Sequence, residues 1–228
     1  MRDLPAELQA RFEAAAHQLP GLDHAVYEQA QRDPRSPIFG LGAHDAAIAF
    51  FGRDPGRDEV HAGVPFIGAG GRQVRRVLHQ RQHGDELTDR AAAIAAGEPY
   101  FWANTVPYKP LGNKAWSMAI KRQFQPLVAT VLHHCWSGSQ VITLGREAFF
   151  WFGIGQTPDV RARLEAHWAD PQRFETSLAI SHAGPDGVAR TLALHPLPHP
   201  SPLNATWFKR FPGLLAARLE TLEGLPWA

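Results

Sequence analysis

Short apolar runs, each ended by a glycine or a polar residue, alternate along this chain with segments of helical periodicity. Three of the runs are DAAIAFFG (45–52), YFWANTV (100–106) and SQVITLG (139–145), and a fourth follows the turn-rich SHAGPDG as one arm of a hairpin. Continuous apolar runs of this length are typical of strands buried on both faces, and strands that alternate with helices usually pair in parallel. The pattern predicts a single-domain α/β fold of three layers, α/β/α, around a central, mainly parallel four-stranded sheet.

The segments between these runs carry apolar residues at helical spacing. Helices are predicted over residues 4–17, 23–31, 68–81, 86–97, 114–135, 160–168 and 205–224, with a kink or break at Pro126. Residues 194–207 carry alternating prolines, so we expect a stiff extended loop that is neither helix nor central strand. No repeat or linker divides the chain, so we expect one domain over residues 1–228, with an N-terminal helical segment (1–37) and a core (38–220).

Composition limits the classes of function that the chain can have. Of its 228 residues, 44% are hydrophobic and 20% are charged, which is typical of a folded globular protein and not of a disordered one. The single cysteine, Cys135, excludes a disulfide framework, a four-cysteine zinc site and a self-contained iron–sulfur cluster. The start lacks a signal-peptide pattern and no run of about 18 apolar residues occurs. We therefore expect a cytoplasmic protein without a membrane partner.

Three loops follow predicted strand ends, the place where α/β proteins bind their ligands. They are GRDPGRDEVHAGVPFIGAGG (52–71), FWANTVPYKPLGNK (101–114) and LHPLPHPSPLNATW (194–207). The candidate site residues on them are Gly52, Arg53, Asp54, Phe66, Asn104, His199, Pro200, Ser201 and Leu203. Taken singly, an aspartate after a strand is equally typical of a helix cap, an asparagine of a turn and a proline-rich loop of a surface linker. Only the three loops considered together indicate a particular function.

In this order the three loops resemble the motifs of the uracil-DNA glycosylase superfamily. GRDPG followed by GVPFIGAGG resembles the first motif of that family, FWANTVPYKPLGN its strand-end asparagine segment, and HPSPLN its motif near the carboxyl terminus. VITLGREAFF is similar to the family's third strand. The resemblance covers residues 38–220 and combines the GEAPG-type first motif with features of the HPSPL-type branch. The branch with the longest match to the first motif holds an iron–sulfur cluster on four cysteines, so Cys135 alone points to a cluster-free hybrid with no cofactor and no metal.

The resemblance implies a monofunctional DNA repair glycosylase. It would flip a deaminated base, uracil first of all, out of DNA and hydrolyse its N-glycosidic bond, leaving an abasic site as product. Asp54 would stabilise the positive charge on the sugar or orient water, and His199 would donate to the oxygen of the departing base. The uracil-removing branch has a tyrosine that helps to exclude the thymine methyl where this chain has Gly56. That departure leaves the choice of base open.

The resemblance also implies which residues bind the base and the DNA. The base-binding candidates are Phe66, Asn104, Gly52 and Arg53, with Phe66 stacking on the base and Asn104 pairing with its amide-like edge. The DNA-binding candidates are Ser201, Leu203, Pro200, Lys109 and Arg72, with Leu203 filling the vacated stack and Ser201 holding a phosphate. The net charge is only +1. Phosphate binding by a monomer of this charge therefore depends on basic residues clustered beside the loops, among them Arg75 and Arg76.

Two other functions fit the same residues. A protein that binds damaged or abasic DNA with little turnover would keep the aromatic, amide and wedge residues. An enzyme similar to a nucleoside hydrolase would use Asp54 on a free nucleoside, although such a substrate needs neither the Leu203 wedge nor basic loops. Excision from uracil-containing strands, measured beside free nucleosides, separates the three.

Overall fold

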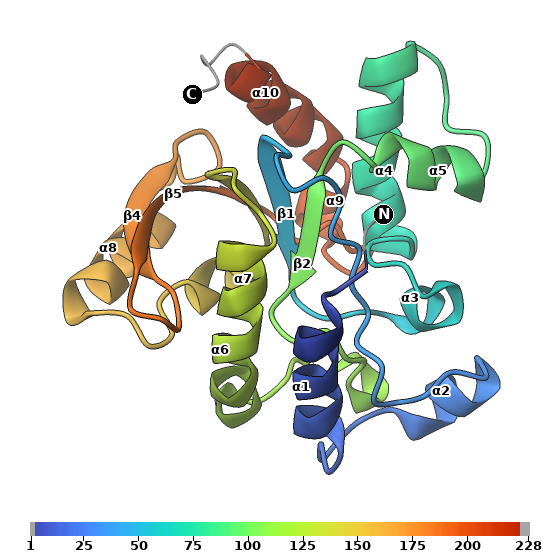
Figure 1. Cartoon of the computed structure of the whole chain (residues 1–228). Coiled ribbons are helices and arrows are strands. Elements are labelled where there is room, and N and C mark those ends of the chain that lie inside the picture. Colours follow the sequence, from blue (N-terminus) through green and yellow to red (C-terminus); the bar gives the residue numbers. More distant parts are fainter. Residues whose placement is uncertain (1–2, 224–228) are drawn as a thin grey trace.

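The predicted apolar runs form the centre of one mixed sheet. The computed structural model describes residues 3–223 and contains strands β1 (Ile48–Gly52), β2 (Phe101–Asn104), β3 (Gln140–Leu144), β4 (Leu178–Ala183) and β5 (Ala189–Leu197). The strand order is β2-β1-β3-β5-β4, and every neighbouring pair is parallel except β4 with β5. The predicted α/β architecture with a mainly parallel sheet is confirmed (Figure 1).

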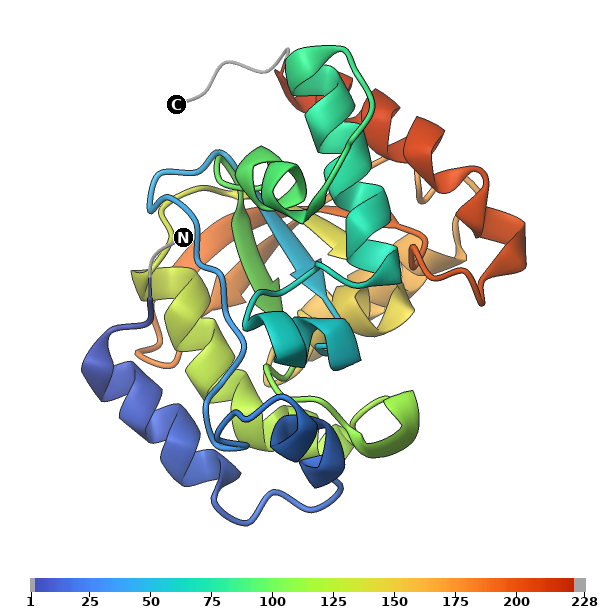
Figure 2. The same cartoon turned by 90° about the vertical axis from the view of Figure 1, so that its right-hand side faces the viewer.

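Side chains along the central strand β1 alternate between two cores, one on each face of the sheet. Phe50 packs with residues of α4 (Ala69–His83), α5 (Arg90–Ala96) and α10 (Phe211–Glu223). Phe51 packs in the core that includes α1 (Ala6–Ala16), α6 (Met118–His134), α7 (Arg146–Trp151) and α8 (Pro158–Ala169). Figure 2 shows these two helical layers above and below the strands. The remaining short helices are α2 (His24–Gln29), α3 (Arg57–Ala62), η1 (Leu111–Asn113) and α9 (Ala205–Phe208).

The sheet has five strands where four were predicted. The additional strand is β4, the first arm of the predicted hairpin, which pairs antiparallel with β5 from Leu178 opposite Leu194 to Ala183 opposite Ala189. An antiparallel strand of this kind is common at the edge of an otherwise parallel sheet, because a short turn suffices to join it to its neighbour.

The proline-rich segment begins inside the sheet, so the prediction that residues 194–207 avoid a central strand is wrong for residues 194–197. Strand β5 continues to Leu197, and Pro196 lies opposite Thr143 of β3. The Ala193 N–H donates to the Ser139 carbonyl, and the Leu197 carbonyl accepts from the Gly145 N–H. The backbone N–H and C=O groups of the odd-numbered residues of β5 therefore point toward β3. The backbone of Pro196 therefore points to the opposite side, where the pairing of β5 with β4 has already ended at Leu194. Its missing N–H costs no ladder bond there.

A helix is present in every predicted range, but α3 and α7 were not predicted and several details differ. Helix α6 starts at Met118 because the Ser117 side chain accepts from the Ile120 N–H and caps it. The break expected at Pro126 does not occur, because this residue lies on the exposed side of α6, where water can satisfy the carbonyl that loses its partner. The last predicted helix is two helices, α9 and α10, with Pro212 in the first turn of α10. Its predicted last residue, Gly224, lies outside the described residues.

The order of the strands positions the functional end of the molecule. After β1 the chain proceeds to β2 on one side, and β3 lies on the other side of β1, so a crevice is expected at the carboxyl ends of these strands. In Figure 1 the arrowhead of β2 points downward, toward the end of the molecule that carries α3 and α2.

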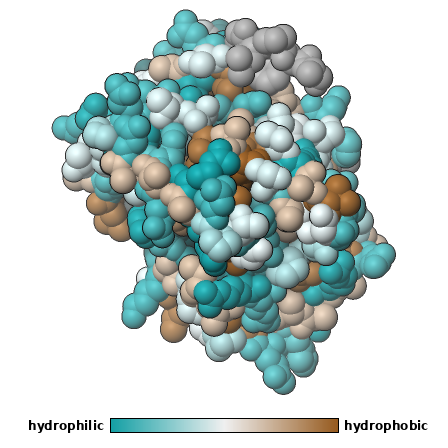
Figure 3. Space-filling view, turned by 90° about the vertical axis from the view of Figure 1, so that its left-hand side faces the viewer, coloured by the Kyte–Doolittle hydropathy of each residue, from teal (hydrophilic) through white to brown (hydrophobic). Residues whose placement is uncertain are grey.

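The surface on the β4 side of the molecule is mostly hydrophilic. Figure 3 shows its hydrophobic residues in small separate groups. Among the helices within residues 3–223, none has the length and apolar character needed to cross a membrane.

Candidate active site

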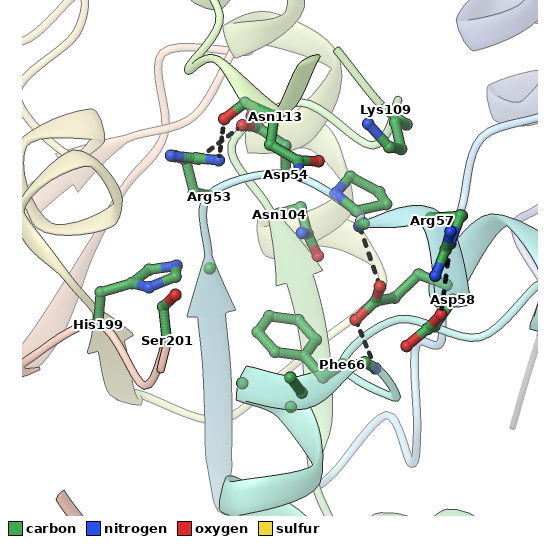
Figure 4. Close-up of a pocket in the computed structure, with 18 of the residues that line it drawn as sticks. Arg53, Asp54, Arg57, Asp58, Phe66, Asn104, Lys109, Asn113, His199 and Ser201 are labelled. Carbon is green, nitrogen blue, oxygen red and sulfur yellow. Dashed lines mark hydrogen bonds and ion pairs between the residues drawn. The ribbon is translucent and has the colours of Figure 1, made fainter. Parts of the chain in front are cut away.

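A cleft of about 960 Å³ opens where the crevice is expected. Its walls come from the loop after β1, the loop after β2 and the loop after β5, segments that are far apart in the sequence. Every predicted site residue except Arg72 lines this cleft. In Figure 4, Phe66 and Asn104 lie between His199 and Ser201 on one side and Arg57 with Asp58 on the other. The structure thus brings together the residues that the three loops contribute.

Asp54 is the most deeply placed carboxylate of the cleft. Its side chain is 1% exposed, and its Oδ2 lies 2.8 Å from Nε of Arg53. Thr105 links the first two loops, since its N–H donates to the carbonyls of Gly52 and Arg53 and its hydroxyl donates to Oδ1 of Asp54 at 3.4 Å. Burial raises the pKa of Asp54 to about 7, against the opposing effects of Arg53 and Lys121. Near neutral pH this carboxyl group therefore exists in both protonation states.

Phe66 and Asn104 form the floor of the cleft. A Cβ on Gly52 would lie 2.6 Å from the Phe66 ring, so only a glycine at the end of β1 lets the ring settle there. The ring also packs against Trp102, with 5.0 Å between centroids. Asn104 is 3% exposed and its amide oxygen has no hydrogen-bond partner among the described residues. Because an unpaired buried polar atom is costly, this oxygen is suited to accept from a ligand.

His199 faces this floor from the third loop. A Cβ on Gly145, which has φ +93°, would lie 2.9 Å from the His199 Cβ, so a glycine after β3 makes room for the histidine. Burial, assisted by the charge of Arg53, lowers the pKa of His199 to about 4. The imidazole is therefore neutral at physiological pH, with one ring N–H available as a donor.

The rest of the third loop forms the rim of the cleft. The Ser201 hydroxyl oxygen accepts from the Leu203 N–H, and the Asn204 amide donates to the His199 carbonyl. These bonds tighten the turn and project Leu203 outward, where its side chain is 96% exposed. A Cβ on Gly70 would lie 3.1 Å from the Pro200 carbonyl oxygen, so the start of α4 packs directly on this loop.

Comparison with protein families agrees with this geometry. Residues 39–223 match the family model described as the uracil DNA glycosylase superfamily. The chain belongs to this superfamily. It is therefore a DNA glycosylase, a hydrolase of base excision repair that acts on DNA. No individual curated protein gives a significant match. The expected membership in this family is thus confirmed over nearly the same residues.

Two basic residues of the glycosylase have structural roles instead of the expected phosphate contacts. Lys109 is 3% exposed, and its ammonium group lies 3.0 Å from Oδ2 of Asp23. Its side chain therefore turns into the protein, although the residue lines the cleft. Arg75 is fully buried and donates to backbone carbonyls. Arg72 and Arg76 of α4 are exposed, so of this basic segment they are the residues that can reach a phosphate.

Three further residues shape the cleft of the glycosylase and were missed from the sequence. The Glu59 side chain accepts hydrogen bonds from backbone N–H groups of the loop after β1. The sequence pattern that could have indicated it is a glutamate three residues after the Gly56 N-cap of α3. Asp23 neutralises Lys109, and the Asn113 carbonyl accepts from Nη2 of Arg53 at 2.9 Å. The last two contacts join distant segments, so no local pattern indicates them. Within residues 3–223 no three His, Cys, Asp or Glu side chains lie together as candidate metal ligands.

Proposed function

We propose that this glycosylase removes uracil from DNA, with Phe66 and Asn104 binding the flipped base and Asp54 and His199 assisting cleavage. The observation that carries the proposal is the buried, unpartnered amide oxygen of Asn104, which lines the same cleft as the Phe66 ring. An amide edge and an aromatic face are what a protein needs to recognise a base taken out of the helix.

The unpaired oxygen of Asn104 supports uracil over cytosine. Uracil carries an N–H at N3, which can donate to this oxygen, whereas N3 of cytosine has no hydrogen and is an acceptor. A cytosine in the same position would face the Asn104 oxygen with its own lone pair, and a site built to receive a donor rejects a ligand that lacks it. Deamination of cytosine to uracil places a hydrogen on N3, and this N–H is the donor that the Asn104 oxygen lacks.

Asp54 and His199 support hydrolysis of the N-glycosidic bond. When the bond between C1′ and N1 breaks, both electrons leave with the base, so the sugar becomes cationic and the base anionic. The Asp54 carboxylate would stabilise the sugar cation and orient the water that adds to C1′, while the proton lost by that water passes to the carboxylate or to solvent. The neutral His199 would donate a hydrogen bond to the oxygen of the departing base, a contact worth about 3–4 kcal/mol in comparable sites.

The exposed rim supports action on DNA instead of on free nucleosides. Flipping a base out of a duplex costs a few kcal/mol, and an apolar side chain inserted in its place offsets part of that cost. The exposure of Leu203, on the turn beside His199, supports this role for its side chain. The Ser201 hydroxyl accepts from the Leu203 N–H and keeps its own hydrogen for a phosphate oxygen.

The test is excision from oligonucleotides that differ in one base. Single- and double-stranded substrates with uracil, hypoxanthine, xanthine or a thymine mismatch are incubated with the protein beside the free nucleosides, and abasic product is detected by strand cleavage in alkali. We expect abasic sites from uracil and intact nucleosides. Tight binding of uracil or abasic DNA without excision would support a damage-binding protein, and hydrolysis of the free nucleosides a small-molecule enzyme. Either outcome would overturn the proposal.

A further inference from the structure

Phe66 has a backbone conformation that its own residue type does not favour. Its φ is +56°, in the left-handed region that residues other than glycine seldom adopt, and among the described residues only Gln31 and Asn113 are similar non-glycine cases. A bulky residue remains in such a conformation only when its surroundings hold it there. The strain is located at the aromatic side chain that forms the floor of the cleft.

Glu59 holds this segment from one side. Its buried carboxylate accepts three backbone N–H groups: Gly56 at 3.0 Å, Ile67 at 3.2 Å and Gly68 at 2.8 Å. A Cβ on Gly56 or Gly68 would lie within 3.0 Å of the carboxylate, so both positions leave no space for a side chain. A single charged group therefore joins the end of the Asp54 loop to the two residues that follow Phe66. Charge-assisted bonds of this kind are the stronger class of hydrogen bond.

Arg75 holds the same segment from the other side. Its Nε donates to the Phe66 carbonyl at 2.8 Å, and its Nη2 donates to the Pro65 carbonyl at 3.1 Å. The third nitrogen donates to the Ala93 carbonyl at 2.9 Å, and the guanidinium lies 4.4 Å above the Trp102 ring. No carboxylate is paired with this guanidinium within residues 3–223. Its hydrogen bonds go to backbone carbonyls, as expected of a group that fixes a chain path.

Glu59 and Arg75 bind the same peptide group. The carbonyl of the Phe66–Ile67 peptide accepts from Arg75, and the N–H of the same peptide donates to Glu59. A peptide group is planar, so holding both of its ends fixes the plane that follows the Phe66 Cα. The bond from Arg75 to the Pro65 carbonyl holds the peptide before Phe66, so the φ and ψ of this residue are constrained from both sides. Gly52 and Trp102 then complete the seat of that ring.

We propose that Glu59 and Arg75 are positioning residues that hold the Phe66 ring ready to stack on the flipped base before the base arrives. This inference rests on the proposed function, because it names what fixes the base-binding floor of that site. The hydrogen bonds of these two side chains go to backbone groups of the segment, so this role needs no contact with the base. Both act through the backbone of Phe66, and their loss lets this residue relax toward ordinary φ values and away from the stacking position.

The experiment compares Glu59→Gln and Arg75→Lys with a matched control, Arg218→Lys. Arg218 is also a buried arginine whose guanidinium donates to backbone carbonyls, those of Phe174 and Thr176, but it lies outside the cleft. Single-turnover excision from uracil DNA is measured well below each variant's melting temperature. We expect losses of about 10- to 100-fold for the two cleft variants, the size typical of a misplaced binding group, and little loss for Arg218→Lys.

A double-mutant cycle distinguishes positioning from general damage. If Glu59 acts through Phe66, then Glu59→Gln should cost much less in a Phe66→Ala background than in the wild type. Additive losses, or equal losses in Arg218→Lys, would overturn the inference.

Backbone hydrogen exchange over residues 64–71 gives a readout that needs no activity. We expect faster exchange in the two cleft variants and unchanged exchange in Arg218→Lys, and unchanged exchange in all three would overturn the inference. A wild-type protein that excises no base would refute the proposed function, while the exchange data would still decide whether Glu59 and Arg75 hold the segment.

Discussion

Arg53 and Asp54, neighbours in sequence, form an ion pair inside the cleft, with Nε of Arg53 2.8 Å from Oδ2 of Asp54. Burial is the larger influence on the carboxyl group and raises its pKa, whereas the guanidinium lowers it, and the pKa settles at about 7. The residue before the proposed catalytic aspartate thus increases the fraction of it that is ionised at neutral pH.

The rate of excision should rise with pH through about 7, because only the ionised Asp54 stabilises a cationic sugar. Arg53→Gln removes the charge that lowers this pKa, so the midpoint of the profile should move to higher pH and the rate at neutral pH should fall. The measurement is single-turnover excision across the pH range. Arg57→Gln removes a positive charge from the same cleft without touching Asp54 and should leave the midpoint in place. A midpoint that moves to lower pH in Arg53→Gln would contradict the assignment.

Asp54→Asn should abolish most excision, by about 10²-fold or more, and yet stabilise the fold at alkaline pH. The folded pKa of about 7 lies above the ordinary 3.8, so the stability that this group contributes is complete below 3.8 and is lost as the pH rises through 7. Above that range the wild type carries a buried charge that the variant lacks. Melting curves should show a higher Tm for the variant at pH 8 and a smaller difference at pH 5. Asp45→Asn, at an exposed position, is the control, and a lower Tm for Asp54→Asn at pH 8 would count against the burial argument.

His199→Ala should lower single-turnover excision by about 10²- to 10³-fold, the effect of losing one donor to the departing base. Because its pKa is about 4, His199 stays neutral through the range in which Asp54 titrates. The variant should therefore keep the wild-type midpoint near 7. The exposed His17→Ala provides the control for activity. Disappearance of the titration in His199→Ala would reassign it from Asp54 to the histidine.

Leu203→Ala should weaken excision from duplex DNA far more than from a single strand, because only the duplex needs its vacated stack filled. The side chain is 96% exposed, so the Tm should not change. Val188→Ala is a matched control, since Val188 is another exposed apolar residue, 62% exposed, in the β4–β5 turn away from the cleft. Equal losses on both substrates would remove Leu203 from the role of wedge.

Mutations of Arg72 and Lys109 should have different effects, the first on DNA binding and the second on stability. Arg72→Ala should weaken DNA binding and reduce the slope of log affinity against log salt by about 1, as the loss of one phosphate contact does. Lys109→Met should leave that slope unchanged and cost about 3–5 kcal/mol of stability, because it leaves Asp23 buried without its partner. DNA-binding titrations at several salt concentrations, with denaturant unfolding, measure both. A reduced slope in Lys109→Met would restore this lysine to the DNA interface.

The strands of the core were predicted from sequence because their signals are local. DAAIAFFG and SQVITLG carry apolar residues on both faces, and such runs have few alternatives to a buried parallel strand. The path of β5 through Pro196 could not be predicted in this way. A proline is excluded from a central strand only where its N–H would face a partner, and here that depends on the pairing of β4 with β5 stopping at Leu178 opposite Leu194.

The candidate site likewise has features that the sequence predicts and features that only the fold decides. The sequence predicts Asp54, Phe66, Asn104 and His199 as members of one candidate site, because the three loops follow strand ends and together resemble the motifs of one family. The structure brings these residues to one cleft. What only the tertiary structure decided is the partner of each charge. Lys109 turns inward to Asp23, and Arg75 and Glu59 hold the two ends of one peptide group beside Phe66. A charged side chain can reach solvent, a phosphate or a buried partner with similar local sequence, and the choice follows from long-range contacts that bury the group and supply its hydrogen bonds.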